Sequence, residues 1–286
     1  MKKTELILNR DGSIFHLNLK PSDISDRIII VGDPGRVDIL AEYLSDIRVR
    51  KENREFKTVT GLFENFELTI LSSGIGTDNI DIVLNELDAL VNIDLATGEL
   101  KNDPVSLTIV RIGTSGSLRS DIPAGSAIIT ETAVGFDGLL HYYSGYDWLL
   151  DSVTADTIAE HLEWPDTFAY PYAINADKEL LERFKDDGFV RGITISAPGF
   201  YAPQGRILRL QPFDTEINDK LANYNFRDRK ICNYEMESSA IYGLSGLLGH
   251  KALTICAIIA NRVTGEFIQD YKPLINEIAQ KVLRRL

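Results

Sequence analysis

An arginine followed by a glycine-rich run has the clearest potential for chemistry in this sequence. The apolar stretch Leu107–Val110 predicts a buried strand, and Arg111 stands where that strand should end. Two glycines in the run that follows relieve steric limits on the backbone. The N–H groups of residues 114–117 and the hydroxyls of Thr114 and Ser115 can then converge on an oxyanion such as phosphate. The alternative is an ordinary turn, for which Gly-Thr-Ser-Gly is also typical.

A second candidate anion site lies in the first strand–turn–helix unit. The sequence predicts a buried strand over Arg27–Gly32 and a helix over Arg36–Leu44. Gly32 then lies at a strand end and Arg36 at a helix start, where the helix dipole favours an anion. The alternative is that Arg36 is an ordinary solvated helix residue.

Two carboxylates flank a methionine just before a predicted apolar helix. Glu235 and Glu237 enclose Met236 in Asn-Tyr-Glu-Met-Glu-Ser-Ser-Ala. Buried carboxylates are costly unless something pairs with them, and the two vicinal hydroxyls of a sugar could do so. Met236 would offer a polarisable surface to the sugar ring. The alternative is that the acids cap the helix N-terminus.

The loop Gly199–Arg206 brings an aromatic ring, an amide and a guanidinium together. Phe200 could stack on a planar heterocycle, while Gln204 and Arg206 hydrogen-bond its carbonyl and imide edges. The alternative is a surface loop with incidental polar residues. His16 lies in an early apolar segment, where a lone histidine is usually structural.

Composition excludes several classes of protein. The 286 residues carry a net charge of −12, which disfavours nucleic acid and anionic membranes as partners. Neither a nucleophile-elbow motif nor a cluster with metal-ligand spacing is present in the sequence, so catalytic triads and metal centres are poorly supported. No signal segment is seen, and Cys232 and Cys256 lack redox spacing. We therefore expect a cytoplasmic protein with reduced thiols.

The elements that must position these residues alternate along the chain. A helical face is predicted by the spacing of Ile80, Val83, Leu84, Leu87 and Val91. Further strands are predicted at Phe56–Val59 and Phe66–Leu71, around a turn near Gly61, and at Ala127–Thr130, Val190–Ser196 and Leu253–Ala260. Further helices are predicted at Glu237–Leu248 and from about Pro273. The sequence thus favours a single α/β domain over residues 1–286.

The pattern weakens over Ala133–Pro171, which is rich in aromatic residues. We interpret this segment as a long excursion near a subunit surface or a site. A surface loop anchored by aromatic packing is the alternative.

Five motifs in this order resemble the nucleoside phosphorylase family, most closely its uridine phosphorylase branch, in a match that starts near Phe15. They are Gly32-Asp33-Pro34-Gly35-Arg36, Asn53-Arg54-Glu55-Phe56, Ser73-Gly74-Ile75-Gly76, Arg111-Ile112-Gly113-Thr114-Ser115-Gly116 and Tyr234-Glu235-Met236-Glu237-Ser238. The resemblance implies a three-layer α/β/α fold with a mixed, partly barrel-like central sheet.

The resemblance also implies roles for individual residues. Phosphate would be held by Gly32, Arg36, Arg111 and Thr114, with Arg54 reaching the phosphate of a neighbouring subunit. Ribose would be bound by Glu237, supported by Met236 and Glu235, with His16 crossing the interface to its 5′-hydroxyl end. The base pocket would be formed by Phe200, Gln204 and Arg206, with Arg262 nearby. Arg111, Glu237 and Arg206 would carry the catalysis.

The activity implied is phosphate-dependent cleavage of uridine to uracil and ribose 1-phosphate, in nucleoside salvage and catabolism. Purine-specific members use an acid near the end of the last core strand, where this chain reads Ala260-Asn261-Arg262. A purine or broad-specificity phosphorylase and a catalytically degenerate nucleoside-binding protein remain as alternatives.

The resemblance implies no cofactor beyond inorganic phosphate as co-substrate, no metal, and a homodimer as the minimal unit, which could assemble further to a hexamer. Some members hold a monovalent cation at the interface with a residue like Glu55. Asn79 stands here where a serine partner is expected, which argues against that ion.

Overall fold

One mixed sheet of eleven strands organises residues 4–286, which the computed structural model describes. Its strands are β1 (Arg27–Val31), β2 (Ser45–Asn53), β3 (Phe56–Phe63), β4 (Phe66–Ser72), β7 (Thr108–Ser117), β8 (Ala127–Gly135), β9 (Tyr172–Asn175), β10 (Val190–Ser196), β11 (Asn225–Phe226), β12 (Arg229–Glu235) and β13 (Lys251–Asn261). The order is β11-β12-β10-β8-β13-β7-β1-β4-β3-β2, with β9 paired to β8. A small hairpin of β5 (Ile93–Asp94) and β6 (Glu99–Leu100) stands apart.

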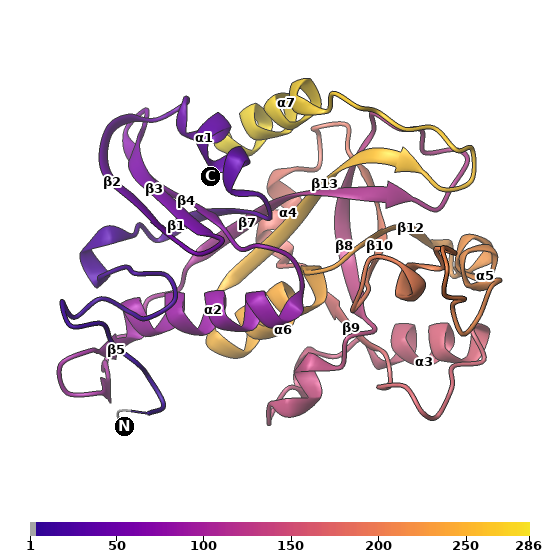
Figure 1. Cartoon of the computed structure of the whole chain (residues 1–286), viewed down its shortest axis with the longest axis horizontal. Coiled ribbons are helices and arrows are strands. Elements are labelled where there is room, and N and C mark those ends of the chain that lie inside the picture. The colour runs from indigo at the N-terminus through magenta and orange to yellow at the C-terminus, as the bar shows by residue number, and fades with distance from the viewer. Residues whose placement is uncertain (1–3) are drawn as a thin grey trace.

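The sheet curls until it closes on itself in one half of the molecule. β12 pairs in parallel with β10 and, at its other edge, in antiparallel fashion with β7. Together with the pairings β10–β8, β8–β13 and β13–β7, this makes a closed ring of strands. The remaining strands, β1 to β4, extend from β7 as an open sheet (Figure 1).

Helices cover this sheet on both sides (Figure 1). They are α1 (Pro34–Ala41), α2 (Thr77–Asn92), α3 (Ser152–His161), α4 (Lys178–Arg183), α5 (Ile217–Asn223), α6 (Ser238–Leu248) and α7 (Lys272–Leu283). α2 packs on α6, whereas α1 contacts α7. This arrangement confirms the predicted α/β fold class with a mixed, partly barrel-like sheet. No helix among residues 4–286 is long and apolar enough to cross a membrane.

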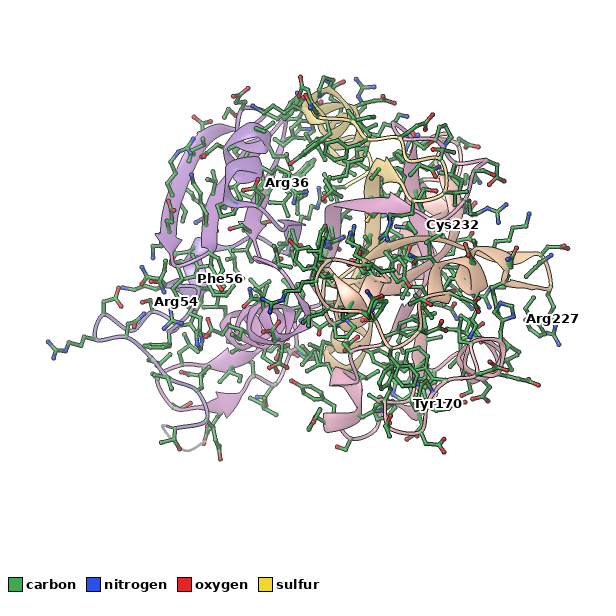
Figure 2. All side chains as sticks on the ribbon, turned by 45° about the vertical axis from the view of Figure 1, so that its right-hand side comes forward. Arg36, Arg54, Phe56, Tyr170, Arg227 and Cys232 are labelled. Carbon is green, nitrogen blue, oxygen red and sulfur yellow. The ribbon has the colours of Figure 1, made fainter. Side chains whose placement is uncertain are left out.

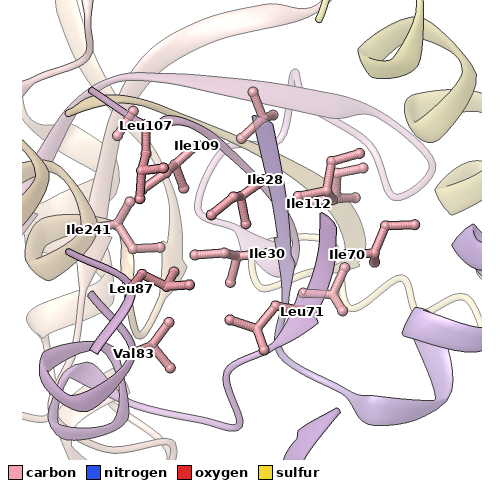
Figure 3. Packing of buried hydrophobic residues seen from close by; sticks show 14 of the residues in the cluster. Ile28, Ile30, Ile70, Leu71, Val83, Leu87, Leu107, Ile109, Ile112 and Ile241 are labelled. Carbon is pink, nitrogen blue, oxygen red and sulfur yellow. The ribbon is translucent and has the colours of Figure 1, made fainter. Parts of the chain in front are cut away.

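The core explains why the apolar runs form strands. Ile28, Ile29 and Ile30 are fully buried because β1 lies between two parallel neighbours, β4 and β7, with helices on both faces. Figure 3 shows Ile30 beside Leu71 of β4, with Val83 and Leu87 of α2 close by. The helical spacing of α2 is confirmed, and of the five apolar residues on the predicted face only Val91 is partly exposed.

The predicted turn near Gly61 is wrong, because this glycine lies inside β3. The hairpin instead turns after Phe63, where Glu64 has a φ of 51°. A Cβ on Gly61 would lie 2.7 Å from the carbonyl oxygen of Ser45 in β2. The glycine therefore serves the close approach of two strands rather than a turn.

The predicted anion-binding loop over residues 114–117 is also wrong. β7 continues to Ser117 and pairs there with β13 and β12. Successive groups of an extended strand point in opposite directions, so the backbone N–H groups of these residues do not converge. Any anion site here must come from side chains.

The aromatic segment contains structure that its sequence pattern does not predict. Its first residues complete β8, and α3 begins at Ser152, where the Asp151 carboxylate accepts from the backbone N–H of Thr154. α3 buries only a narrow stripe of small and β-branched side chains, which is a weak helical signal. The helix α1 also differs slightly from its prediction, since it ends at Ala41.

We expect Gly61→Ala to lower the free energy of unfolding by about 1–3 kcal/mol, because two paired backbones would have to separate. Urea denaturation measures this loss. Gly35→Ala is the matched control, since its Cβ would meet only Asp33 atoms at 3.4 Å or more. An equal loss in both variants would contradict the role assigned to Gly61.

Candidate active site

Arg111 lies at the centre of a buried charge cluster between β7 and the β12–α6 junction. Its side chain is 4% exposed, and its Nη1 atom lies 3.1 Å from Oε2 of Glu235. Its Nη2 atom donates to Oε2 of Glu237. Burial alone would lower the pKa of Arg111, but the two carboxylates raise it above its usual value. The arginine therefore stays charged and neutralises both acids only in part.

Glu235 and Glu237 have different tasks. The Glu235 carboxylate accepts from the backbone N–H groups of Glu237 and Ser238 and from the Ser196 hydroxyl, at 2.5–3.0 Å. Glu235 therefore caps α6, as the alternative prediction had it. Glu237 instead turns to Arg111 and accepts from the backbone N–H of Gly76 at 2.8 Å. Met236 lies between them with a half-buried side chain.

A second buried arginine lies close to this cluster. Arg36 on α1 donates from Nη1 to the carbonyl oxygen of Ile112 at 3.2 Å. Gly32 makes room for it, because a Cβ there would lie 3.2 Å from Nη2 of Arg36. Burial lowers the pKa of Arg36, and the positive charge of Arg111 lowers it further. Two neighbouring buried cations favour an anion between them.

The unpaired atoms of these two arginines also favour an anion between them. The Nε atoms of Arg36 and Arg111 are both buried without a hydrogen-bond partner. A buried N–H group without a partner is costly, and a phosphate oxygen is a suitable acceptor. Thr114, also expected at the phosphate, is partly buried three residues beyond Arg111 on β7.

Gly113 has a role that differs from the turn expected of it. A Cβ at this position would lie 2.1 Å from Nη1 of Arg111 and 3.0 Å from Sγ of Cys256. The glycine thus leaves space for the guanidinium to fold back along β7. Cys256 lines that space, with its Sγ 3.5 Å from Nη1, and burial raises the pKa of its thiol to about 12.

Arg54 lies away from this cluster. It is exposed at the turn between β2 and β3 with a φ of 56°, and its Cζ lies 5.8 Å from the centre of the Phe15 ring. Figure 2 shows Arg54 separated from Arg36 across the open sheet. The structure therefore does not place Arg54 in the anion site of its own chain.

His16 lies near Phe15 and is held by a residue that the sequence did not single out. The Glu86 carboxylate on α2 is 2.6 Å from Nδ1 of His16 and accepts the backbone N–H groups of His16 and Leu17. A carboxylate at Nδ1 requires the proton there, and the His16 side chain remains 29% exposed. Nothing in the sequence spacing connects residues 16 and 86.

The four residues predicted for the base pocket do come together. Arg206 donates from Nη1 to Oε1 of Gln204 at 2.5 Å, and its Cζ lies 3.7 Å above the Phe200 ring. Arg262 donates from Nη2 to the backbone carbonyl of Gln204 at 3.2 Å. Since arginine only donates, the Gln204 oxygen must face Arg206, which directs the Nε2 group of Gln204 elsewhere.

This cluster contains unpaired buried groups as well. Nη1 of Arg262 and the hydroxyl of Tyr234 are buried without a hydrogen-bond partner. Burial raises the pKa of Tyr234, against the opposing effect of Arg262 and Arg206. Burial and the charge of Arg262 lower the pKa of Arg206 to about 10. The cluster is thus rich in donors and suited to carbonyl oxygens.

The doubtful cation position is defined by Glu55 and Asn79. Both side chains lie beside Gly74, whose φ is 71° and whose Cβ would be 2.4 Å from Nδ2 of Asn79. Among residues 4–286, no group of three or more histidine, cysteine or acidic residues could hold a metal ion.

Comparisons with known proteins identify the family of this chain. Residues 26–286 match the model of the Phosphorylase superfamily. A uridine phosphorylase of Thermococcus kodakarensis is 28% identical over 90% of this chain and 80% of its own length. A guanosine phosphorylase of Halorubrum lacusprofundi is 26% identical over 87% of this chain and 84% of its own.

A solved structure of a Trypanosoma brucei nucleoside phosphorylase, described as showing uridine phosphorylase activity, superposes with a TM-score of 0.88. It is 28% identical and covers 98% of this chain and 99% of its own. The chain belongs to the phosphorylase superfamily. Within that superfamily it is a nucleoside phosphorylase, an enzyme that transfers a pentosyl group, which confirms the resemblance found in the sequence.

We expect Arg111→Gln to lower the free energy of unfolding by about 3–5 kcal/mol, because it leaves two buried carboxylates without their counter-ion. Arg183→Gln is the control, since Arg183 forms an ion pair with Glu179 on the surface of α4 and a 3.3 Å hydrogen bond to the backbone carbonyl of Arg285, and its loss should cost below about 0.5 kcal/mol. Similar losses in urea denaturation would contradict the central role of Arg111.

Proposed function

We propose that this enzyme cleaves uridine with inorganic phosphate to give uracil and ribose 1-phosphate. The observation that carries the choice of base is the donor-rich pocket of Gln204, Arg206 and Arg262. Uracil offers two carbonyl oxygens and one N–H along its edge, and these match two donors and the remaining lone pair of the Gln204 oxygen.

The residue at the position of the purine-specific acid supports this choice. Asn261 donates from Nδ2 to two backbone carbonyls and accepts at Oδ1 from two backbone N–H groups, at 2.8–2.9 Å. Its side chain is occupied in holding the turn after β13, and an amide has no acidic proton to give to a purine ring.

Phosphate would bind between Arg36 and Arg111, where the two unpaired Nε groups lie. A phosphate dianion there would compete with Glu237 for Arg111, so that Glu237 could turn to the 2′- and 3′-hydroxyls of ribose. Phosphate binding and sugar binding would thus support one another. A water-using nucleosidase needs no such pair of buried arginines.

The reaction would proceed by charge stabilisation and positioning. As the C1′–N1 bond stretches, its electron pair moves to the base, and positive charge develops on the ribose at C1′. The phosphate dianion stabilises that charge and then forms the new C1′–O bond. Arg206 and Arg262 stabilise the negative charge that spreads to the carbonyl oxygens of the departing uracil.

Substrate comparison tests this proposal. We expect uridine to be cleaved with a kcat/KM at least about tenfold above those of thymidine, inosine and adenosine. Omitting phosphate should abolish base release, and ribose 1-phosphate should form in step with uracil. Faster cleavage of inosine or adenosine would refute the assignment of the base, and release of uracil without phosphate would refute phosphorolysis.

We further propose that the active unit is a dimer in which Arg54 and His16 complete the site of the partner. Arg54 is exposed and apart from Arg36, and the His16 side chain is 29% exposed while Glu86 holds its Nδ1 atom. Both residues lie on the same surface, beside Phe15. A second copy could therefore receive them together.

Mixing two inactive variants tests this shared site. Arg54→Ala and Glu237→Gln should each lower kcat/KM by about a hundredfold or more. In a mixed dimer, one site would combine the intact Glu237 of one chain with the intact Arg54 of the other. Random exchange should then restore about a quarter of the wild-type activity.

The control for this experiment mixes Glu237→Gln with Arg36→Ala. Both residues belong to one chain's own site, so no mixed dimer regains an intact site. Recovered activity in this control would contradict the shared arrangement. A failure to recover activity when Glu237→Gln is mixed with Arg54→Ala would contradict it as well.

A further inference from the structure

A cavity of about 730 Å³ lies outside the candidate active site. It is enclosed by the ends of β8 and β10, the residues after α3, the start of α5, and the helical turn Ala202–Gln204 of the base-binding loop. These elements lie together in the half of the molecule that carries α3 and α5 (Figure 1). Its volume is typical of small-molecule sites. None of the residues assigned above to phosphate, ribose or base lines it.

Aromatic rings form a continuous wall of this cavity. The Phe136 and Trp164 ring centres are 4.4 Å apart, those of Trp164 and Phe168 are 5.7 Å apart, and those of Phe168 and Phe213 are 5.3 Å apart. Phe168 and Phe213 remain 45% and 76% exposed. A flat apolar ligand would cover these exposed faces.

The charges around the cavity are predominantly negative. Its lining includes the carboxylates of Asp137, Glu163, Asp214 and Glu216 and a single ammonium group, that of Lys220. Lys220 is already engaged, since its Nζ lies 2.9 Å from Asp214 and 3.6 Å from Glu163. The aromatic faces also attract positive charge. The lining therefore favours a cation over an anion of the same shape.

The cavity shares its structural elements with the base-binding loop. Ala202 and Pro203 line it, and the next residue in the chain is Gln204. A Cβ on Gly205 would lie 2.8 Å from Cγ2 of Ile217, which is itself a lining residue on α5. α5 is therefore packed directly against the backbone that positions Gln204 and Arg206. A ligand that moves α5 must also move this loop.

We propose that this cavity is a second ligand site that binds a flat aromatic cation. The bound cation would change the position of the base-binding loop through α5. Binding here does not require that the enzyme act on uridine. The action on the loop rests on the proposed base pocket.

Tryptophan fluorescence provides a direct test, because the chain has two tryptophans and Trp164 lines the cavity. Trp148→Phe, at a 72% exposed position, leaves Trp164 as the reporter. Three probes of similar size and shape differ in charge: benzamidine is a cation, benzamide is neutral and benzoate is an anion. We expect saturable binding of benzamidine, about tenfold weaker binding of benzamide, and the weakest binding for benzoate. Equal affinities, or no saturation by benzamidine, would overturn the site.

Two substitutions locate the binding. Phe213→Ala should weaken benzamidine binding about fivefold, whereas Leu210→Ala, at a 77% exposed position of the same loop outside the lining, should leave it unchanged. Glu216→Gln should weaken the binding of benzamidine but not of benzamide. Identical effects of Phe213→Ala and Leu210→Ala would show that benzamidine binds elsewhere.

The action on the loop is measured by repeating the benzamidine titration with saturating uracil. We expect the affinity to change by about threefold or more, since linked sites alter each other's affinity by the same factor. An unchanged affinity in a protein that binds uracil would overturn the action on the loop. A protein that does not bind uracil would instead refute the proposed base pocket and leave the benzamidine result standing.

Discussion

The pairing of Arg111 with Glu235 and Glu237 is the interaction on which the rest of the site depends. A buried arginine holds two carboxylates, one of which caps α6 and one of which accepts from the backbone N–H of Gly76. The desolvation of three charged groups is tolerated because each has a counter-ion or several hydrogen bonds. The helix start, the proposed anion site and the proposed ribose contact are therefore parts of a single electrostatic unit.

The closed ring of strands sets this unit in place. Inside the ring, a buried chain of hydrogen bonds joins Thr130 to Thr194, Thr194 to Asn233 and Asn233 to Ser115, across four different strands. Each polar group in this chain has a partner, which makes the relative position of the strands specific. Asn233 lies two residues before Glu235 on β12, so these hydrogen bonds also fix the position of the Glu235 carboxylate.

Sequence reasoning succeeded where a residue's chemistry was unusual for its local pattern. An arginine in an apolar run and acids before an apolar helix singled out Arg111, Glu235 and Glu237, which the structure brings into one cluster, although Arg111 lies inside β7 and not at its end. The residues predicted for the base also lie together, and their roles stay predictions. It failed where distant segments decide the outcome. The extension of β7 to Ser117 depends on pairing with β13 and β12, both more than a hundred residues away, and Glu86 meets His16 only through the packing of α2. The narrow apolar stripe of α3 gave too little local signal to reveal a helix.

The pairing of β7 with β12 has a consequence for how the enzyme matures. This contact joins segments far apart in the chain and carries a large loop-closure cost, so it is expected to form late in folding. Arg111 and Glu235 belong to these two strands and meet only when the ring is closed. A chain in which β7 and β12 have not yet paired therefore lacks the contact between Arg111 and Glu235, and its charge unit is incomplete.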